Sequence, residues 1–257
     1  MSKSTIKKVS SKFLKSHEID DMENVIVPLK KHKKTSTAGL FNLHIKDIHP
    51  LTENQGRVFR CYDDDKNIVC SGSAGTGKSF VLLYLCLHDL IHSREYNKVM
   101  IFRSSVPTRN IGFLPGDEKE KLAVYEAPYK AICGDLFSRS DAYDILKKKD
   151  LIEFQSTSYV RGNTFDNCLI IVDECQDMNL HELSTVITRC GQGTRIFFSG
   201  DFKQCDFDGK REVSGFNDFI RIVNQIESFE VVDFGLDDIV RSGLVKEYLV
   251  AKEKLNL

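Results

Sequence analysis

Residues 72–79 read Gly-Ser-Ala-Gly-Thr-Gly-Lys-Ser and fit the pattern G-x-x-x-x-G-K-[ST], which binds phosphate groups. The glycines allow the backbone to curl so that successive N–H groups point inward at an anion. In such a loop Lys78 reaches the β- and γ-phosphate oxygens of ATP, and the Ser79 hydroxyl ligates Mg²⁺. The alternative is a glycine-rich turn without a ligand. The residues predicted to bind the nucleotide here are Gly75, Thr76, Gly77, Lys78 and Ser79.

Two adjacent acids, Asp173 and Glu174, follow the apolar run 169–172 further along the chain. This order predicts two carboxylates at the carboxyl end of a buried strand. In a phosphate-loop enzyme the first acid, Asp173, holds Mg²⁺ directly or through water. Glu174 is then positioned to take a proton from an attacking water, which predicts nucleotide hydrolysis and disfavours a small-molecule kinase. The alternative is a solvated strand end.

Polar residues at two other positions are candidates for nucleotide contacts. The apolar run 196–199 ends in Gly-Asp, and either Asp201 or Gln204 could contact the γ-phosphate; the alternative is a plain turn. Upstream of the loop, the amide of Gln55 could read the hydrogen-bonding edge of adenine. A capped start of an amphipathic helix has the same local pattern as the segment around Gln55.

Short apolar runs rich in Val, Ile and Phe must position these side chains. They alternate with segments long enough for helices, which predicts an α/β fold with a mostly parallel sheet and helices on both faces. Residues 80–90 are apolar nearly all round, so we expect a helix packed on most sides there. The expected strands are 67–71, 98–103, 151–155, 168–172, 195–199 and 229–234.

Residues 107–128 break this alternation with glycines, prolines and a cluster of charges at 117–121. They predict a long surface excursion from the end of the second strand, the edge where open parallel sheets bind ligands. The alternative is an exposed connector without a role.

Composition limits the remaining possibilities. The 257 residues suffice for one large domain, and the net charge of −1 gives no argument for nucleic-acid or membrane binding. Residues 1–35, however, hold nine lysines and four acids. We predict a basic, flexible tail over residues 1–40, with nucleic-acid contact as the alternative role, and a single phosphate-loop ATPase domain over residues 41–257.

The eight cysteines form no C-x-x-C pair, which predicts small buried hydrophobic side chains in a reducing compartment. No apolar run approaches the roughly 18 residues of a membrane span, and no secretory signal is visible. The sequence therefore predicts a soluble, cytoplasmic protein without membrane association.

Several short motifs follow one another along the chain, at 51–55, 72–79, 103, 112–117, 159–162, 173–176, 200–204, 214–216 and 238–241. Together they resemble the motifs of the PhoH-like proteins, phosphate-starvation-inducible ATPases that are similar to a single core domain of superfamily 1 helicases. The runs Gly-Phe-Leu-Pro-Gly-Asp at 112–117 and Tyr-Val-Arg-Gly at 159–162 are close to diagnostic of that family.

This resemblance implies a RecA-like P-loop NTPase fold and a set of roles. Arg241 would act as an arginine finger, on its own nucleotide or on that of a neighbouring subunit in a ring; the alternative is a solvated or salt-bridged helix residue. Arg103 and Arg161 would lie where helicase-like domains meet nucleic acid. The remaining implied roles are adenine contact by Gln55, phosphate and Mg²⁺ binding by Lys78 and Ser79, metal binding by Asp173, water activation by Glu174, and γ-phosphate sensing by Gln204.

Two functions from different classes remain open. The first is a Mg²⁺-dependent, helicase-like ATPase coupled to, or stimulated by, RNA or single-stranded DNA. A single core domain would need assembly into a homo-oligomer to move along a strand. The second is an ATP-regulated switch that acts on a protein partner without remodelling nucleic acid. The basic tail favours the first function, and the near-neutral net charge favours the second.

Overall fold

The computed structural model describes residues 43–93, 95–104, 118–157, 160, 162, 164–201 and 214–255. The expected basic tail lies outside these residues. All six expected strands are confirmed, each to within about one residue at its ends. They are β1 (Asn67–Gly72), β2 (Lys98–Arg103), β3 (Ile152–Ser156), β4 (Cys168–Asp173), β5 (Arg195–Gly200) and β6 (Phe229–Phe234).

Helices connect most of the strands, as the apolar pattern predicts. The α-helices are α1 (Glu53–Asp63), α2 (Lys78–His92), α3 (Glu118–Phe137), α4 (Ala142–Lys148), α5 (Leu180–Ile187), α6 (Ser214–Val223) and α7 (Gly243–Lys254). Two short 3₁₀ turns, η2 (Cys175–Asp177) and η5 (Leu236–Asp238), follow β4 and β6. Of the helices that the structure describes, none has both the length and the apolar character needed to cross a bilayer.

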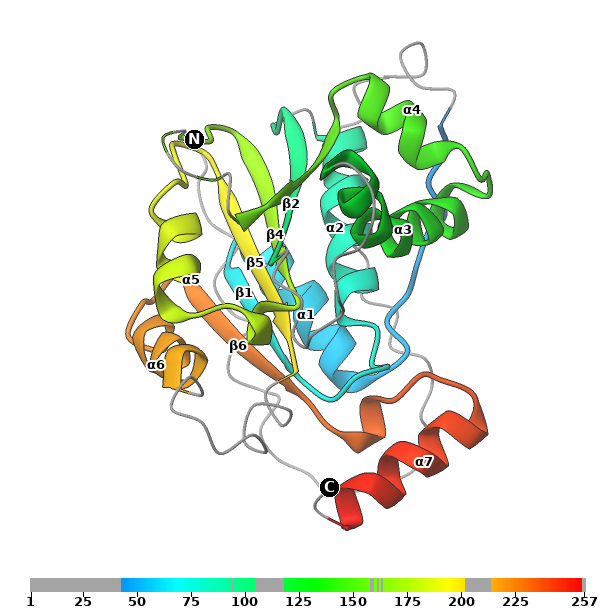
Figure 1. Cartoon of the computed structure of the whole chain (residues 1–257). Helices are drawn as coiled ribbons and strands as arrows, with labels where there is room; N and C mark the ends of the chain where they lie inside the picture. Colours follow the sequence, from blue (N-terminus) through cyan, green and yellow to red (C-terminus); the bar gives the residue numbers. More distant parts are fainter. Residues whose placement is uncertain are drawn as a thin grey trace, which may run out of the picture.

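The strands form one sheet in the order β3-β2-β4-β5-β1-β6, and every neighbouring pair is parallel (Figure 1). All carboxyl ends therefore meet at one edge. There Arg103 is the register partner of Asp173, and Ser71 is the partner of Gly200. The order also inserts β5 between β1, which leads into the phosphate loop, and β4, which leads into the acid pair.

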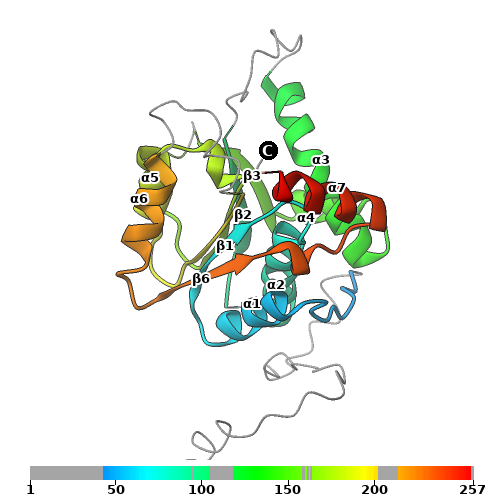
Figure 2. The same cartoon turned by 90° about the horizontal axis from the view of Figure 1, so that it is seen from below.

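Helices cover both faces of the sheet, with α5 and α6 on one side and α1, α2, α3 and α4 on the other (Figures 1 and 2). The sheet has a hydrophobic core on each face, and alternate residues of a strand pack into different cores. In β2, Val99 and Ile101 pack beneath α2, whereas Met100 and Phe102 face the side of α5 and α6. Helix α2 is buried on most sides, as its apolar sequence predicts. The α/β fold with a parallel sheet is confirmed.

One sequence expectation is wrong. Residues 118–128, expected to belong to a surface excursion, form the first half of α3. The Glu and Lys residues at 118–121 are good helix formers, and their charges resemble those of a loop only in composition. Pro128 lies inside the helix, although proline in a helix interior usually predicts a break. Buried Tyr129 and Cys133 anchor the second half of α3 in the core. Residues 107–117 of the predicted excursion lie outside the described part of the chain.

Helix α6 comes very close to the start of α5 at Gly215. A Cβ atom on Gly215 would lie 2.7 Å from the backbone nitrogen of Leu180 and 3.3 Å from backbone atoms of Asn179. Asn179 caps α5, and its side chain accepts a hydrogen bond of 2.9 Å from the Glu182 N–H. The backbone at Asn179 and Leu180 cannot move without disturbing this cap, so the contact requires glycine at position 215.

We predict that Gly215→Ala lowers the free energy of unfolding by roughly 1–3 kcal/mol, the usual cost of overpacking. Alanine alone would favour the helix by about 0.5–1 kcal/mol, so the sign of the change reports the close contact. The matched control is Gly134→Ala in α3, where a Cβ would meet its nearest atom at 3.8 Å. We expect this control to leave stability unchanged or raise it. Denaturant unfolding measures both variants, and equal stabilisation of the two would contradict the close contact.

Candidate functional site

The loop between β1 and α2 has the curled backbone that its glycines predict. Gly72, Gly75 and Gly77 have φ angles of 120°, 81° and 83°, in a region that residues with side chains rarely adopt. Gly72 also lies against β6, because a Cβ on it would come within 2.0 Å of the Phe234 carbonyl oxygen. The first glycine of the motif is thus required both by its conformation and by its contact with the neighbouring strand.

Lys78 is the first residue of α2 and turns its ammonium back toward the loop. Its Nζ donates hydrogen bonds to the carbonyl oxygens of Gly72, at 2.7 Å, and Ser73, at 2.8 Å. Burial lowers the pKa of Lys78, while the nearby carboxylates, foremost Asp201 and then Asp173, oppose this shift. The structure therefore holds a largely buried cation against the predicted phosphate cradle.

Ser79 and Asp173 come together, as the prediction of a metal site requires. The Ser79 hydroxyl donates a 2.8 Å hydrogen bond to Oδ1 of Asp173 and lies 3.3 Å from the hydroxyl of Ser199 on β5. Mg²⁺ is commonly bound through one or two protein oxygens, with waters and substrate phosphates completing its octahedron. One hydroxyl and one carboxylate beside a phosphate loop fit this donor set.

The second oxygen of Asp173 is also bonded, by a residue that sequence reasoning missed. The Tyr129 hydroxyl, on α3, donates a 2.8 Å hydrogen bond to Oδ2. Burial, followed by the charge of Asp173, raises the pKa of Tyr129 well above its usual range. No local pattern around Tyr129 could have indicated this contact, because it depends on how α3 packs on the sheet.

Glu174 has a left-handed backbone, with φ 51° and ψ 42°. This conformation costs a residue with a side chain roughly 1–3 kcal/mol and occurs often at functional sites. A hydrogen-bond relay leads from Glu174 back to the loop. The Gln176 amide donates to the Glu174 carboxylate and accepts from the Asp201 N–H at 3.0 Å, and Asp201 accepts from the Ala74 N–H at 3.1 Å. The carboxylate of Asp201 thus contacts the phosphate loop; its predicted γ-phosphate contact stays a prediction.

Gln55 lies in α1, whose first turn is capped by Thr52. The helix-start interpretation of this segment is therefore confirmed. The Gln55 side chain is buried, donates to the Thr76 carbonyl oxygen at 2.9 Å and accepts from the Leu51 N–H at 2.8 Å. It braces the phosphate loop from α1, and its predicted contact with adenine stays a prediction.

Arg241 packs on the phosphate loop of its own chain, two residues before α7 begins. A Cβ on Gly75 would lie 2.9 Å from Cγ of Arg241, and the neighbouring Val240 N–H donates to the Gly75 carbonyl oxygen at 3.1 Å. The segment after β6 therefore covers the middle of the loop, and the arginine side chain remains exposed.

The predicted nucleic-acid residues are only partly described. Arg103, at the carboxyl end of β2, lies with its guanidinium carbon 5.4 Å from the centre of the Tyr125 ring on α3. Arg161 and Gln204 lie outside the described residues. The nucleic-acid role of both arginines and the sensor role of Gln204 stay predictions.

The described cysteines are free, and all but Cys190 are buried, as their apolar surroundings predict. Burial raises the pKa of the Cys70 and Cys133 thiols to about 12. Cys175, next to the acid pair, also has a pKa well above its usual range because it is buried and because Asp173 is close. A thiol in this environment is a packing group and not a nucleophile.

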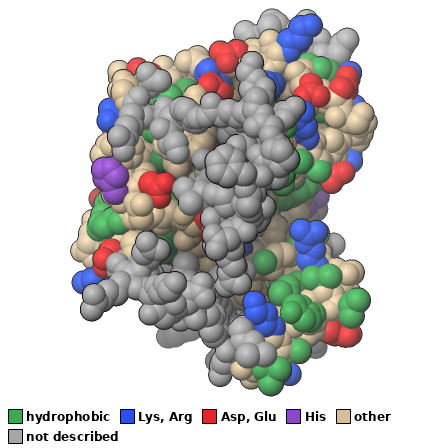
Figure 3. Space-filling model, in the orientation of Figure 1, with side chains coloured by type: hydrophobic (Ala, Val, Ile, Leu, Met, Phe, Trp, Pro, Cys, Tyr) green, Lys and Arg blue, Asp and Glu red, His purple; other side chains and the backbone are tan. Residues whose placement is uncertain are grey.

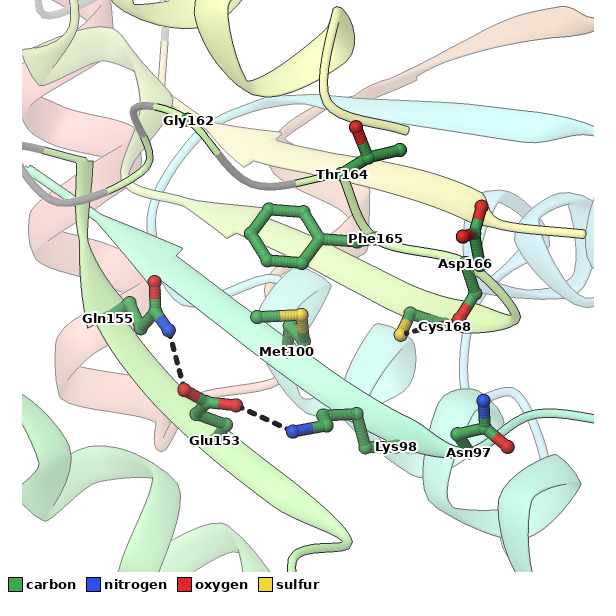
Figure 4. Close-up of a pocket in the computed structure, with 10 residues that line it drawn as sticks. All are labelled: Asn97, Lys98, Met100, Glu153, Gln155, Gly162, Thr164, Phe165, Asp166 and Cys168. Atoms are coloured by element: carbon green, nitrogen blue, oxygen red, sulfur yellow. Dashed lines mark hydrogen bonds and ion pairs between the residues drawn. The ribbon is translucent and has the colours of Figure 1, made fainter. Parts of the chain in front are cut away.

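A separate pocket of about 480 Å³ lies over β2, β3 and β4 (Figure 4). Met100 and Phe165 contribute its apolar part, and Glu153 forms a 2.8 Å ion pair with Lys98 at its side. Its lining includes neither the phosphate loop nor the acid pair. This pocket is therefore distinct from the candidate site at the carboxyl edge of the sheet.

Comparison with known proteins bears on these features. A family model described as PhoH-like protein matches residues 47–253. The chain belongs to the PhoH-like family. The resemblance predicted from the ordered motifs is thereby confirmed, and it covers both the phosphate loop and the acid pair.

Relatives in this family are similar over most of the chain. Protein PhoH of Escherichia coli K12 is 29% identical over 211 residues, which cover 80% of this chain and 59% of that protein. A PhoH-like protein of Bacillus subtilis 168 is 30% identical over 212 residues, covering 82% and 66%. The chain thus spans 59% of the length of the Escherichia coli relative. Among solved structures, the large terminase of a thermophilic bacteriophage, in complex with ADP, aligns with a TM-score of 0.45 and 13% identity over 78% of this chain and 49% of that chain.

Proposed function

We propose that this PhoH-like protein binds ATP and Mg²⁺ at the phosphate loop, hydrolyses the ATP, and couples hydrolysis to RNA or single-stranded DNA. The observation that carries the proposal is the 2.8 Å hydrogen bond between Ser79 and Asp173, beside a loop with the phosphate-binding backbone. Glu174 follows directly. A hydroxyl, a metal-binding acid and a general base thus lie at one edge of the sheet, as phosphoryl transfer to water requires.

Each residue of this edge has a defined task in the proposed reaction. The loop N–H groups and the Lys78 ammonium bind the phosphate oxygens and neutralise their charge. Ser79 and Asp173 would hold Mg²⁺, which supplies further charge neutralisation on the β- and γ-phosphates. Glu174 takes a proton from the attacking water while Gln176 orients its carboxylate.

Coupling to nucleic acid is the part of the proposal that separates it from its rival. The lysine run at 30–34 and Arg103 at the functional edge of the sheet support it. The rival is an ATP-regulated switch that acts on a protein partner. ATP turnover measured with and without RNA and single-stranded DNA tests the two. Faster turnover with RNA or single-stranded DNA supports coupling. Slow turnover that neither polymer changes favours the switch.

Exposed apolar side chains on α7 support assembly into a homo-oligomer. Leu244 and Tyr248 are 78% and 67% exposed, and hydrophobic side chains gather over α7 at the lower right of Figure 3. On its inner side, Leu249 lies near the phosphate loop, 3.7 Å from where a Cβ on Gly75 would be. A second copy that covered the exposed face of α7 would therefore lie close to the ATP site, as in a ring with sites between subunits.

Glu174→Gln should retain binding of ATP with Mg²⁺ but lower turnover by about 10²–10⁴-fold, because the cradle is intact and the general base is lost. Phosphate release measures turnover, and calorimetric titration measures affinity. Glu230→Gln, which makes the same change at an exposed ion pair with Arg57, is the control and should behave as the parent. Parent-like turnover in Glu174→Gln would exclude Glu174 as the base.

Lys78→Ala should lower ATP affinity at least tenfold, because charge-assisted contacts in a partly dehydrated site contribute about 1.5–3 kcal/mol each. Lys98→Ala removes a lysine from the separate pocket and should leave affinity unchanged. Circular dichroism of both variants checks that the fold persists. Unchanged affinity in Lys78→Ala would contradict the assignment of the phosphate loop itself.

Arg241→Ala should lower turnover with little effect on ATP affinity. If Arg241 acts as an arginine finger, the loss of turnover can reach about 10³–10⁵-fold. Arg221→Ala, which removes an exposed side chain of α6, is the control. Because Arg241 packs on Gly75 of its own chain, we expect no rescue when Arg241→Ala is mixed with Glu174→Gln. Recovery of activity in a mixture shown to exchange subunits would instead mean that the arginine acts on a neighbouring subunit's nucleotide.

A further inference from the structure

We propose that Tyr129 is a positioning residue that orients the Asp173 carboxylate for Mg²⁺. The inference rests on the proposed function, since it assigns Tyr129 a role toward the same metal. It goes further by naming a side chain on α3, outside the sequence motifs, as part of the site. Tyr129 would act through Asp173 and would not touch nucleotide or metal itself.

The geometry divides the two oxygens of Asp173 between two partners. Oδ1 accepts from the Ser79 hydroxyl at 2.8 Å, and Oδ2 accepts from the Tyr129 hydroxyl at 2.8 Å. Two anchors fix the rotation of a carboxylate, whereas one leaves it free to turn. The bond from Tyr129 therefore keeps Oδ1 directed at Ser79, the other residue that would hold the metal.

Burial makes this hydrogen bond hard to replace. Asp173 is 4% exposed and Tyr129 is 2% exposed, so bulk water has little access to Oδ2. The ring of Tyr129 is held independently of its hydroxyl, since it packs 5.7 Å from the ring of Phe154 and shares a core with Cys133 on the next turn of α3. Removing the hydroxyl alone should thus leave the ring in place and free the carboxylate.

The expected effect is on the metal more than on the fold. Mg²⁺ requires near-ideal octahedral geometry, so a site with a single protein carboxylate depends strongly on its orientation. Loss of a hydrogen-bond partner behind a metal ligand typically costs about 10–100-fold in metal affinity or activity. If the Tyr129 hydroxyl had only a structural role in the core, its loss would change stability but not the Mg²⁺ dependence of ATP affinity.

The test compares Tyr129→Phe with Tyr143→Phe. Tyr143, on α4, is 1% exposed, and its hydroxyl has no hydrogen-bond partner among the described residues. Both substitutions remove one buried hydroxyl and keep the ring. For the full chain and each variant, the affinity for ATP is measured by calorimetric titration in EDTA and over a range of Mg²⁺ concentrations. No turnover is needed for this measurement.

For Tyr129→Phe we expect the Mg²⁺ concentration for half-maximal enhancement of ATP affinity to rise about 10-fold or more. Its affinity in EDTA should stay within about twofold of the parent, and Tyr143→Phe should match the parent in both conditions. An unchanged Mg²⁺ requirement in Tyr129→Phe would overturn the inference alone. If the ATP affinity of the parent protein is the same in EDTA and in Mg²⁺, the proposed metal site is overturned together with this inference.

A second pair of variants tests whether Tyr129 acts through Asp173. In an Asp173→Asn background the metal-binding carboxylate is already lost, so adding Tyr129→Phe should change the response to Mg²⁺ by less than about twofold. A full effect of Tyr129→Phe in that background would overturn the proposed route. Melting temperatures of all variants show whether each is folded at the temperature of the titration.

Discussion

The hydrogen bond between Ser79 and Asp173 is the interaction on which the rest of the site depends. It joins the first turn of α2 to the end of β4, although β4 is not a neighbour of β1, the strand that leads into the loop. The bond spans β5, and it can form because β5 presents a small residue, Ser199, beneath it. Sheet order and one short side chain thus decide whether the two halves of the proposed Mg²⁺ site can meet.

One cation and three carboxylates lie near the same point. The largely buried ammonium of Lys78 lies near Asp173, Glu174 and Asp201, and these carboxylates oppose the loss of its proton that burial favours. The loop itself adds backbone carbonyl oxygens as hydrogen-bond acceptors for the lysine. Binding of a triphosphate would replace these acceptors with phosphate oxygens, so the contacts of Lys78 in this structure are those that a nucleotide would have to displace.

The segment after β6 bears directly on the loop. Phe234 lies against Gly72, and the residues at 240–241 lie against Gly75, so β6 and the segment just before α7 confine the start and the middle of the loop backbone. Helix α7 carries exposed apolar side chains on its outer face. If a second copy covers that face, as we propose, its contacts would reach the phosphate loop through α7 itself. Assembly and nucleotide binding would then be linked by one short segment.

The sequence by itself determined the six strands, the curled loop at 72–79 and the position of the acid pair at the end of a buried strand. Each of these is a local pattern, an apolar run or a glycine spacing, whose physical cause lies within a few neighbouring residues. Only the tertiary structure decided that Tyr129 bonds Asp173 and that Gln55 braces the loop. The physical reason is that such hydrogen bonds join groups far apart in the chain. Their partners are set by how helices pack on the sheet, which no short stretch of sequence records.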